Sequence, residues 1–342
     1  MKSNNPLVSI MIPNYNHGKF LDQCIQSALK QTYDNIEIVV LDNCSEDDSI
    51  EVIKKYTKDG VRLFKNLTNI FSNSFEVISE LTSGKYKMLL CADDCILPEF
   101  VQKAVSIMEE HPNVGYVHCE KDFINEDGDI IPLDPFYNCS FIVSGNEVMP
   151  IYLLTPVAFP NQGVFRTSCF ESINGYNQII CFANADRTLW FYLSTVGDYA
   201  YIKEKLALYR IHSSSASFRS TQNLYGPIFD YLSIYNLIEY SKLKNYTNVL
   251  ARADEAYKKI AGFCLSYIAS LLKKSNFKTA NEFLLFCKLF DPEIEKNDYY
   301  IKLKSIQETE AVDIEYLDNK AQDGYDRKRS YEPPKGYQRI DI

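Results

Sequence analysis

The chain has 342 residues, of which 46% are hydrophobic and 24% are charged, a composition typical of a globular protein with a sizeable buried core. Its net charge is −9, which argues against broad binding to nucleic acid because such binding needs a basic face. The negative charge does not exclude phosphate-containing ligands, since a divalent cation can bridge carboxylates to phosphates.

The ten cysteines contain no CxxC pair and no His/Cys cluster with zinc spacing. Several, such as Cys24, Cys264 and Cys287, lie within apolar runs and are predicted to be small buried hydrophobic residues. We therefore expect reduced thiols and a cytoplasmic location. The N-terminal residues show no signal-peptide pattern, and no stretch approaches the roughly 20 apolar residues that a membrane span needs.

The first third of the chain alternates between short apolar runs and segments with helical spacing. The predicted elements, in chain order, are a strand at 7–13, a helix at 21–29, a strand at 36–42, a helix at 45–56, a strand at 61–64, a helix at 72–83, a strand at 86–94, a helix at 98–110 and a strand at 114–120. This alternation predicts an α/β fold with a mostly parallel, doubly wound sheet. Ligands of such sheets bind outside the carboxyl ends of the strands.

Polar residues follow three of these predicted strands. They are Pro13-Asn14-Tyr15-Asn16 after the first strand, Asp42-Asn43 after the second and Asp93-Asp94 after the fourth. Because the carboxyl ends of parallel strands meet at one edge of a sheet, we expect these side chains to cluster. Two adjacent aspartates are costly to keep charged unless something positive lies beside them. The sequence therefore predicts a cation or a basic group at this edge.

Beyond residue 120 the pattern changes twice. Residues 120–215 are mixed, with a helix near 187–196, and long helical patterns occupy about 222–290. After about 305 the chain is charged and contains two adjacent prolines, which is typical of a tail or an extended packing arm. We expect a first domain at 6–218, a helical domain at 219–304 and a charged tail or packing arm at 305–342.

One helical stretch has two interpretations. The apolar residues of 257–278 have lysines at both ends, a pattern that fits contact with an anionic membrane surface. It fits a core-packing helix with solvated lysines better. Peripheral membrane contact is therefore one expectation for this stretch, and core packing is the alternative.

Five stretches resemble the family 2 glycosyltransferases with the GT-A fold. They are VSIMIPNYNHGKFLDQCIQSALKQTYDNIEIVVLDNCSEDDS, NIFSNSFEVISELTSGKYKMLLCADDCILPEF, NQGVFRTSCFESINGYNQ, NADRTLWFYL and LYRIHSSSAS. Their order matches the usual order of motifs in that family, and together they span about residues 6–218. The helical region beyond 222 lies outside the resemblance.

The resemblance implies a nucleotide-sugar donor bound with Mn²⁺ or Mg²⁺. The acidic pair corresponds to the family's metal motif, with Asp94 and His212 as metal ligands and Asp93 near the ribose and sugar. The sequence departs from the family in placing Cys91 where the first aspartate of that motif usually stands. The alternatives are that the aspartates cap the turn before Pro98 and that His212 is structural.

The resemblance also assigns a nucleotide pocket and a general base. Asp42 corresponds to the family's base-reading acid, which accepts from the imide N–H of uracil, and Pro13, Tyr15 and Asn16 line the same pocket. Asp186 corresponds to the general base that removes the proton of the acceptor hydroxyl. In the alternative interpretations, Asp42 and Asp186 cap the helices that follow them.

By the resemblance, the expected function is transfer of one sugar, a hexosyl transfer, from a UDP-sugar to a hydroxyl of a growing glycan or lipid-linked saccharide. By the resemblance, transfer is metal-dependent and inverting and belongs to bacterial surface-glycan synthesis. The alternative is a degenerate, non-catalytic protein that binds nucleotide sugars as a scaffold. Cys91 and Ala185, both at positions where the family usually has an acid, motivate that alternative.

Overall fold

The computed structural model describes residues 5–71, 73–155, 157–178, 185–215, 224–325 and 330–342. Its strands are β1 (Val8–Asn14), β2 (Ile36–Asp42), β3 (Arg62–Lys65), β4 (Tyr86–Leu89), β5 (Cys95–Ile96), β6 (Val114–Ile124), β7 (Ile130–Ile131), β8 (Phe141–Val143), β9 (Gly163–Arg166), β10 (Asp198–Arg210) and β11 (Gln338–Arg339). The α-helices are α1 (Gly18–Leu29), α2 (Ser49–Lys55), α3 (Asn73–Glu80), α4 (Phe100–Glu110), α5 (Gly145–Leu154), α6 (Thr167–Ser172), α7 (Ala185–Ser194), α9 (Tyr225–Lys244), α10 (Thr247–Leu250), α11 (Ala253–Lys273), α12 (Phe277–Phe290), α13 (Asp298–Thr309) and α14 (Ile314–Tyr325). Short 3₁₀ turns are η1 (Thr57–Asp59), η2 (Pro160–Gln162), η3 (Gly175–Gln178) and η4 (Ile294–Lys296).

The first half of the sheet is the predicted parallel array. Strands β4, β1, β2 and β3 lie side by side in this order, all parallel. Asn14 lies opposite Asp42 in the register of β1 and β2. The predicted fourth strand ends earlier than expected, at Leu89, because the acidic pair forms a turn in which the Asp94 N–H donates to the Cys91 carbonyl at 3.0 Å.

The second half of the sheet is mixed. Strand β9 lies between β4 and β6 and is antiparallel to both, whereas β10 runs parallel to β6. The fold is therefore α/β, as predicted, with a parallel array that β9 interrupts. Apolar residues recur along each strand of this array and bury both faces of the sheet.

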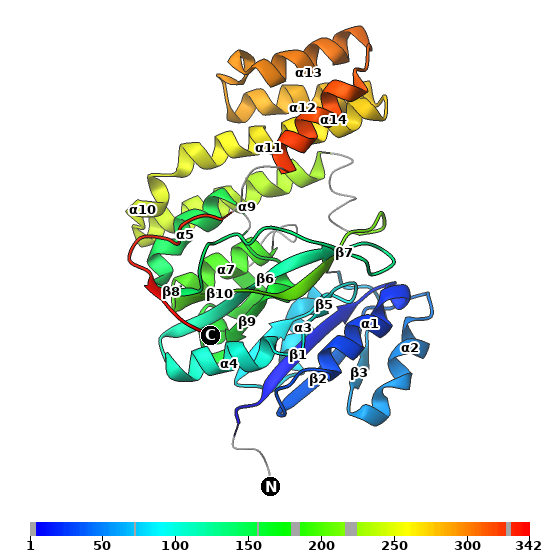
Figure 1. Cartoon of the computed structure of the whole chain (residues 1–342), viewed down its shortest axis with the longest axis vertical. Coiled ribbons are helices and arrows are strands. Elements are labelled where there is room, and N and C mark those ends of the chain that lie inside the picture. Colours follow the sequence, from blue (N-terminus) through cyan, green and yellow to red (C-terminus); the bar gives the residue numbers. More distant parts are fainter. Residues whose placement is uncertain (1–4, 72, 156, 179–184, 216–223, 326–329) are drawn as a thin grey trace.

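The helices α9 to α14 stack on one side of the sheet (Figure 1). Their buried residues belong to the same apolar core as one face of the sheet, a core that contains Met11, Trp190, Leu237 and Ile268. Helix α13 crosses residue 304, so helical packing continues past the predicted boundary. The division at 218 and 304 stays a prediction.

Helix α11 covers most of residues 257–278, the stretch that fits either membrane contact or core packing. It buries Ile260, Cys264 and Ile268, while Lys258 and Lys259 are exposed. These contacts are those of a core-packing helix. Within the described residues, no helix combines the length and the apolar character that crossing a bilayer demands.

The C-terminal arm, residues 331–342, returns from the helices to the sheet (Figure 1). The Tyr331 N–H donates to the Phe136 carbonyl at 2.8 Å, and the Asn138 side chain donates to Glu332 at 2.5 Å. Strand β11 then pairs antiparallel with β8. The predicted tail or packing arm at 305–342 also contains helix α14, and its bounds stay a prediction.

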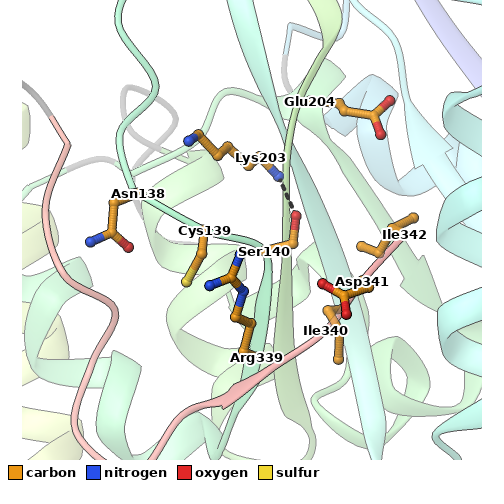
Figure 2. A pocket seen from close by; sticks show the side chains of 9 residues that line it. All are labelled: Asn138, Cys139, Ser140, Lys203, Glu204, Arg339, Ile340, Asp341 and Ile342. Atoms are coloured by element: carbon orange, nitrogen blue, oxygen red, sulfur yellow. Dashed lines mark hydrogen bonds between the residues drawn. The ribbon is translucent and has the colours of Figure 1, made fainter.

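A surface pocket of about 460 Å³ lies under the end of this arm (Figure 2). Its lining residues are Asn138, Cys139, Ser140, Lys203, Glu204, Arg339, Ile340, Asp341 and Ile342. The Lys203 N–H donates to the Ser140 hydroxyl at 3.0 Å. None of the predicted site residues lines this pocket, so we assign it to the packing of the arm.

A buried histidine in β6 predicts acid sensitivity. His118 packs against Tyr116, Trp190 and Tyr199, and neither ring nitrogen has a hydrogen-bond partner among the described residues. Burial, with the nearby Lys121 charge, lowers the pKa of His118 well below its ordinary value. Only the unfolded state therefore takes up this proton below about pH 6.5, so stability is lost as the pH falls from there.

We expect His118→Leu to remove this part of the pH dependence. Between pH 7.5 and 5.5, the free energy of unfolding of the wild type should fall by about 1 kcal/mol more than that of the variant. Denaturant titrations at both pH values measure the difference. Equal losses in the two proteins would contradict the prediction.

Candidate active site

Side chains from the ends of four strands meet at one edge of the sheet. The register of β1 and β2 places Asn14 beside Asp42, and the Leu90 N–H donates to the Met11 carbonyl, which holds the chain after β4 against β1. At the end of β10, the Arg210 N–H donates to Asp94 at 2.8 Å. The structure thus brings together the polar groups that the strand pattern predicted.

Asp93 and His212 form a direct pair. Nε2 of His212 lies 3.0 Å from Oδ2 of Asp93, and Nδ1 lies 2.8 Å from the Ser214 hydroxyl. The His212 side chain is fully buried, with its ring centroid 4.7 Å from that of Phe20. Burial opposes ionisation of Asp93, but the hydrogen bond from His212 and the charge of His17 outweigh it and lower the pKa of this carboxyl.

The pKa of Asp94 is shifted in the opposite direction to that of Asp93. Its Oδ1 accepts the Arg210 N–H, whereas its Oδ2 is buried and has no hydrogen-bond partner among the described residues. Burial, and then the charge of Asp93, raise the pKa of Asp94 well above its ordinary value. A cation at Oδ2 would supply the missing partner and offset the repulsion, so this residue fits a metal ligand.

Two overlapping groups of possible ligand atoms surround this position. The ligand atoms of His17, Asp93 and His212 lie within 4.8 Å of one another, as do those of Cys91, Asp93 and Asp94. Burial raises the pKa of the Cys91 thiol, so it stays protonated and is a poor ligand. Asp93, predicted to lie near the ribose, is shared by both groups and is therefore a candidate ligand as well.

Sequence reasoning did not include His17. It directly follows the polar group after the first strand, and that position was the available signal. Its ring lies edge-on to that of His212, with centroids 5.9 Å apart. Imidazole nitrogens beside carboxylates suit Mn²⁺ better than Mg²⁺, which prefers oxygen ligands.

Arg210 orders the acidic turn. Its guanidinium donates to the Asp93 carbonyl at 2.7 Å, to the Asn125 carbonyl at 2.8 Å and to the Gln23 side chain at 2.6 Å. Arg210 is 1% exposed, so its side chain is enclosed by these partners. It supplies positive charge next to the two aspartates, which the sequence required.

Asp42 is buried at the end of β2. Its Oδ1 accepts the Asn14 side-chain N–H at 2.8 Å, and its Oδ2 accepts the Ser45 N–H at 3.0 Å. The alternative interpretation made Asp42 the cap of the next helix, but Asp48 holds that position at the start of α2. Asp42 therefore orders the loop at Ser45 and is placed at the shared edge.

The neighbouring nucleotide-pocket residues have different settings. Pro13 is half-buried within β1, one residue before the strand ends. Asn16 has a positive φ of 56°, and its N–H donates to the Ser45 hydroxyl at 2.9 Å. Tyr15 is 41% exposed, so its ring is accessible for stacking on a ligand.

Asp186 lies in the first turn of α7. Its Oδ1 accepts the Arg187 N–H at 2.8 Å. Burial raises the pKa of Asp186 above its ordinary value, although the Arg187 N–H and charge oppose the increase. Its charge contributes, after burial and the charges of Asp94 and Asp93, to the raised pKa of Cys91. A carboxylate of increased basicity suits a general base.

Comparison with known proteins identifies the family of the domain that contains this site. Residues 9–170 match the family model described as glycosyl transferase family 2. The chain carries a family 2 glycosyltransferase domain. As predicted, this domain is that of a transferase.

Curated relatives of this glycosyltransferase include an uncharacterized glycosyltransferase of Haemophilus influenzae, 28% identical over 230 residues that cover 63% of this chain and 68% of that protein. Another, from Rickettsia bellii, is 29% identical over 212 residues that cover 62% of this chain and 30% of the relative. An Escherichia coli chondroitin synthase is 24% identical over 63% of this chain and 30% of its own length. The chain thus spans less than a third of the latter two proteins.

Solved structures show the fold. Staphylococcus aureus TarS 1-349 in complex with UDP-GlcNAc has a TM-score of 0.52 at 15% identity, covering 88% of this glycosyltransferase and 91% of the TarS chain. The mannosyltransferase PcManGT of Pyrobaculum calidifontis, in complex with GDP-Man and Mn²⁺, has a TM-score of 0.52 at 13% identity, covering 91% and 89%. The α/β GT-A fold with a helical C-terminal region is confirmed.

Proposed function

We propose that this glycosyltransferase moves one sugar from a UDP-sugar to an acceptor hydroxyl, with inversion at the anomeric carbon. The observation that carries the proposal is the buried Oδ2 of Asp94, which has no hydrogen-bond partner in the described part of the chain and lies beside the Asp93–His212 pair. A site that concentrates carboxylates around a position for a cation suits a diphosphate leaving group. Asp42 lies at the end of β2 at this edge of the sheet, and Asp186 lies in the first turn of α7.

The donor side of the proposal rests on the residues after β1 and β2. Asp42 is the base-reading acid, and the exposed ring of Tyr15 lies next to Pro13 and Asn16, where a nucleoside would stack. The TarS and PcManGT structures contain UDP-GlcNAc and GDP-Man, which supports a nucleotide-sugar donor. For the acceptor we propose a growing glycan or a lipid-linked saccharide, reached by peripheral contact with the cytoplasmic face of a membrane.

A divalent cation, proposed to be Mn²⁺ or Mg²⁺, would be held by Asp94 and His212, with Asp93 and His17 as further ligands. When bound, it supplies positive charge that stabilises the leaving diphosphate, an electrostatic contribution worth several kcal/mol. Arg210 keeps the acidic turn in place through its bonds to the Asp93 carbonyl and the Asp94 carboxylate. Neighbouring solved structures contain Mn²⁺, which supports this choice of ion.

Asp186 performs the proton transfer in this proposal. Its carboxylate accepts the proton of the acceptor hydroxyl as the acceptor oxygen bonds to the anomeric carbon. The bond from that carbon to the diphosphate oxygen breaks in the same step, and the nucleoside diphosphate leaves with the electron pair. The raised pKa of Asp186, caused by burial, strengthens the base for this task.

Ligand-dependent stabilisation tests the donor assignment. We expect UDP and UDP-sugars with Mn²⁺ to raise the Tm by several degrees, since a ligand at a hundred times its Kd stabilises by about 2.7 kcal/mol. GDP, and UDP with a chelator, are the controls and should give smaller shifts. A shift without any release of UDP from a panel of UDP-sugars would favour the scaffold alternative, and equal shifts with and without metal would contradict the proposed cation.

A further inference from the structure

Buried polar contacts join helix α7, which carries the proposed base, to helix α9. Nη1 of Arg187 in α7 lies 3.3 Å from Oδ1 of Asp230 in α9, and the two side chains are 2% and 13% exposed. One residue further along, the Thr188 hydroxyl lies 3.0 Å from the Ser233 hydroxyl. Both contacts begin directly after Asp186 and end on α9, and both helices lie outside residues 9–170, which match the family model.

Asp230 is the counter-charge that makes the burial of Arg187 tolerable. A buried guanidinium without a partner is strongly destabilising, and so is breaking a buried ion pair by removing one partner. Nε and Nη1 of Arg187 have no hydrogen-bond partner among the described residues. Compensation of the buried positive charge therefore depends more strongly on the ion pair with Asp230. The position of Arg187, and with it the first turn of α7, therefore depends on α9.

We propose that Asp230 is a positioning residue for Asp186, acting through Arg187. The ion pair fixes the first turn of α7 at the active-site edge, and it balances the positive charge that Arg187 places beside the base. This inference rests on the proposed function, in which Asp186 is the general base. It makes the helical region part of the catalytic unit.

Within the described part of the chain, titratable groups from several segments interact electrostatically with Asp186. They are Arg187 in α7, Asp230 in α9, Cys91 after β4 and Tyr176 in η3. Burial raises the pKa values of Cys91 and Tyr176, so both stay neutral at physiological pH. Among these groups, only Arg187 and Asp230 carry charge, and they act on the pKa of Asp186 in opposite directions.

Because Arg187 and Asp230 shift the pKa of Asp186 in opposite directions, variants of the two residues distinguish a positioning role from a merely structural one. The probe is release of UDP from UDP-GlcNAc with Mn²⁺ and water as acceptor, replaced by another member of a UDP- and GDP-sugar panel if that donor reacts faster. We expect Asp230→Asn to lower kcat about tenfold to a hundredfold with an unchanged KM for the donor, and to move the acid limb of the kcat profile to lower pH. Arg187→Gln should move the acid limb to higher pH.

Two further variants are controls. Asp230→Glu keeps the charge and should recover most of the lost kcat. Ser233→Ala removes an uncharged contact between the same two helices, so it should leave the acid limb in place. Should Asp230→Asn fail to fold, the apolar pair Arg187→Met with Asp230→Leu carries the test, since buried ion pairs usually tolerate joint replacement. That pair should fold and still lose kcat.

The outcomes distinguish this inference from the proposed function. A folded Asp230→Asn variant with wild-type kcat and acid limb overturns it, as does an acid limb that moves in the same direction in Asp230→Asn and Arg187→Gln. Wild-type kcat in the apolar pair also overturns it. If Asp186→Asn is as active as the wild type, the proposed base is wrong instead, and the failure lies with the proposed function.

Discussion

Asp94→Asn is expected to lower the rate of nucleotide release about a thousandfold, because a neutral amide cannot offer the anionic ligand oxygen that holds a divalent cation. The substitution is nearly isosteric. The amide oxygen can still accept the Arg210 N–H that Oδ1 accepts in the wild type, so the turn is retained. Measurement of kcat at saturating Mn²⁺ checks the loss.

The same substitution should leave the metal-free protein as stable as the wild type or more so. Burial and the Asp93 charge raise the pKa of Asp94 in the folded state. Keeping this carboxyl ionised therefore destabilises the fold at pH values above the unfolded pKa of about 3.9, and asparagine removes that cost. Thermal unfolding with a chelator should give a Tm equal to or above that of the wild type.

Asp127→Asn is the matched control, because Asp127 is an exposed aspartate outside the acidic turn. It should change neither kcat nor the Mn²⁺-dependent shift in Tm. If Asp94→Asn kept activity within about tenfold of the wild type, the assignment of Asp94 as a metal ligand would have to be withdrawn.

Asp186→Asn should lower kcat by about a hundredfold to ten-thousandfold, the range that general base catalysis contributes. Asparagine can still accept the Arg187 N–H, so the first turn of α7 is preserved. What is lost is the ability to take the proton of the acceptor. Single-turnover assays with a nucleotide sugar, and with water or a supplied acceptor, measure the loss.

Donor binding separates this variant from Asp94→Asn. Asp186→Asn should retain the full Mn²⁺-dependent stabilisation by UDP, because Asp186 belongs to neither group of possible ligand atoms around Asp93. Asp94→Asn should lose most of that stabilisation. A loss of UDP binding in Asp186→Asn would place this residue in the donor pocket and argue against its role as base.

The parallel half of the fold was readable from the sequence because its signals are local. Apolar runs such as 36–42, bounded by polar residues, mark buried strands, and parallel strands must direct their carboxyl ends to one edge. That rule alone brings Asp42 and the acidic pair together. The antiparallel insertion of β9 between β4 and β6 was not predicted, because strand pairing between distant segments leaves no local pattern.

The sequence by itself determined the α/β class, the family resemblance and the edge of the sheet at which Asp42, Asp93 and Asp94 were expected, and the resemblance added Asp186 and His212. Only the tertiary structure decided how their charges are balanced. It places His17 beside His212, turns the Arg210 guanidinium onto the acidic turn and pairs Arg187 with Asp230. These partners lie far apart along the chain, and the energy of a charge depends on neighbours and burial that exist only once the chain has folded.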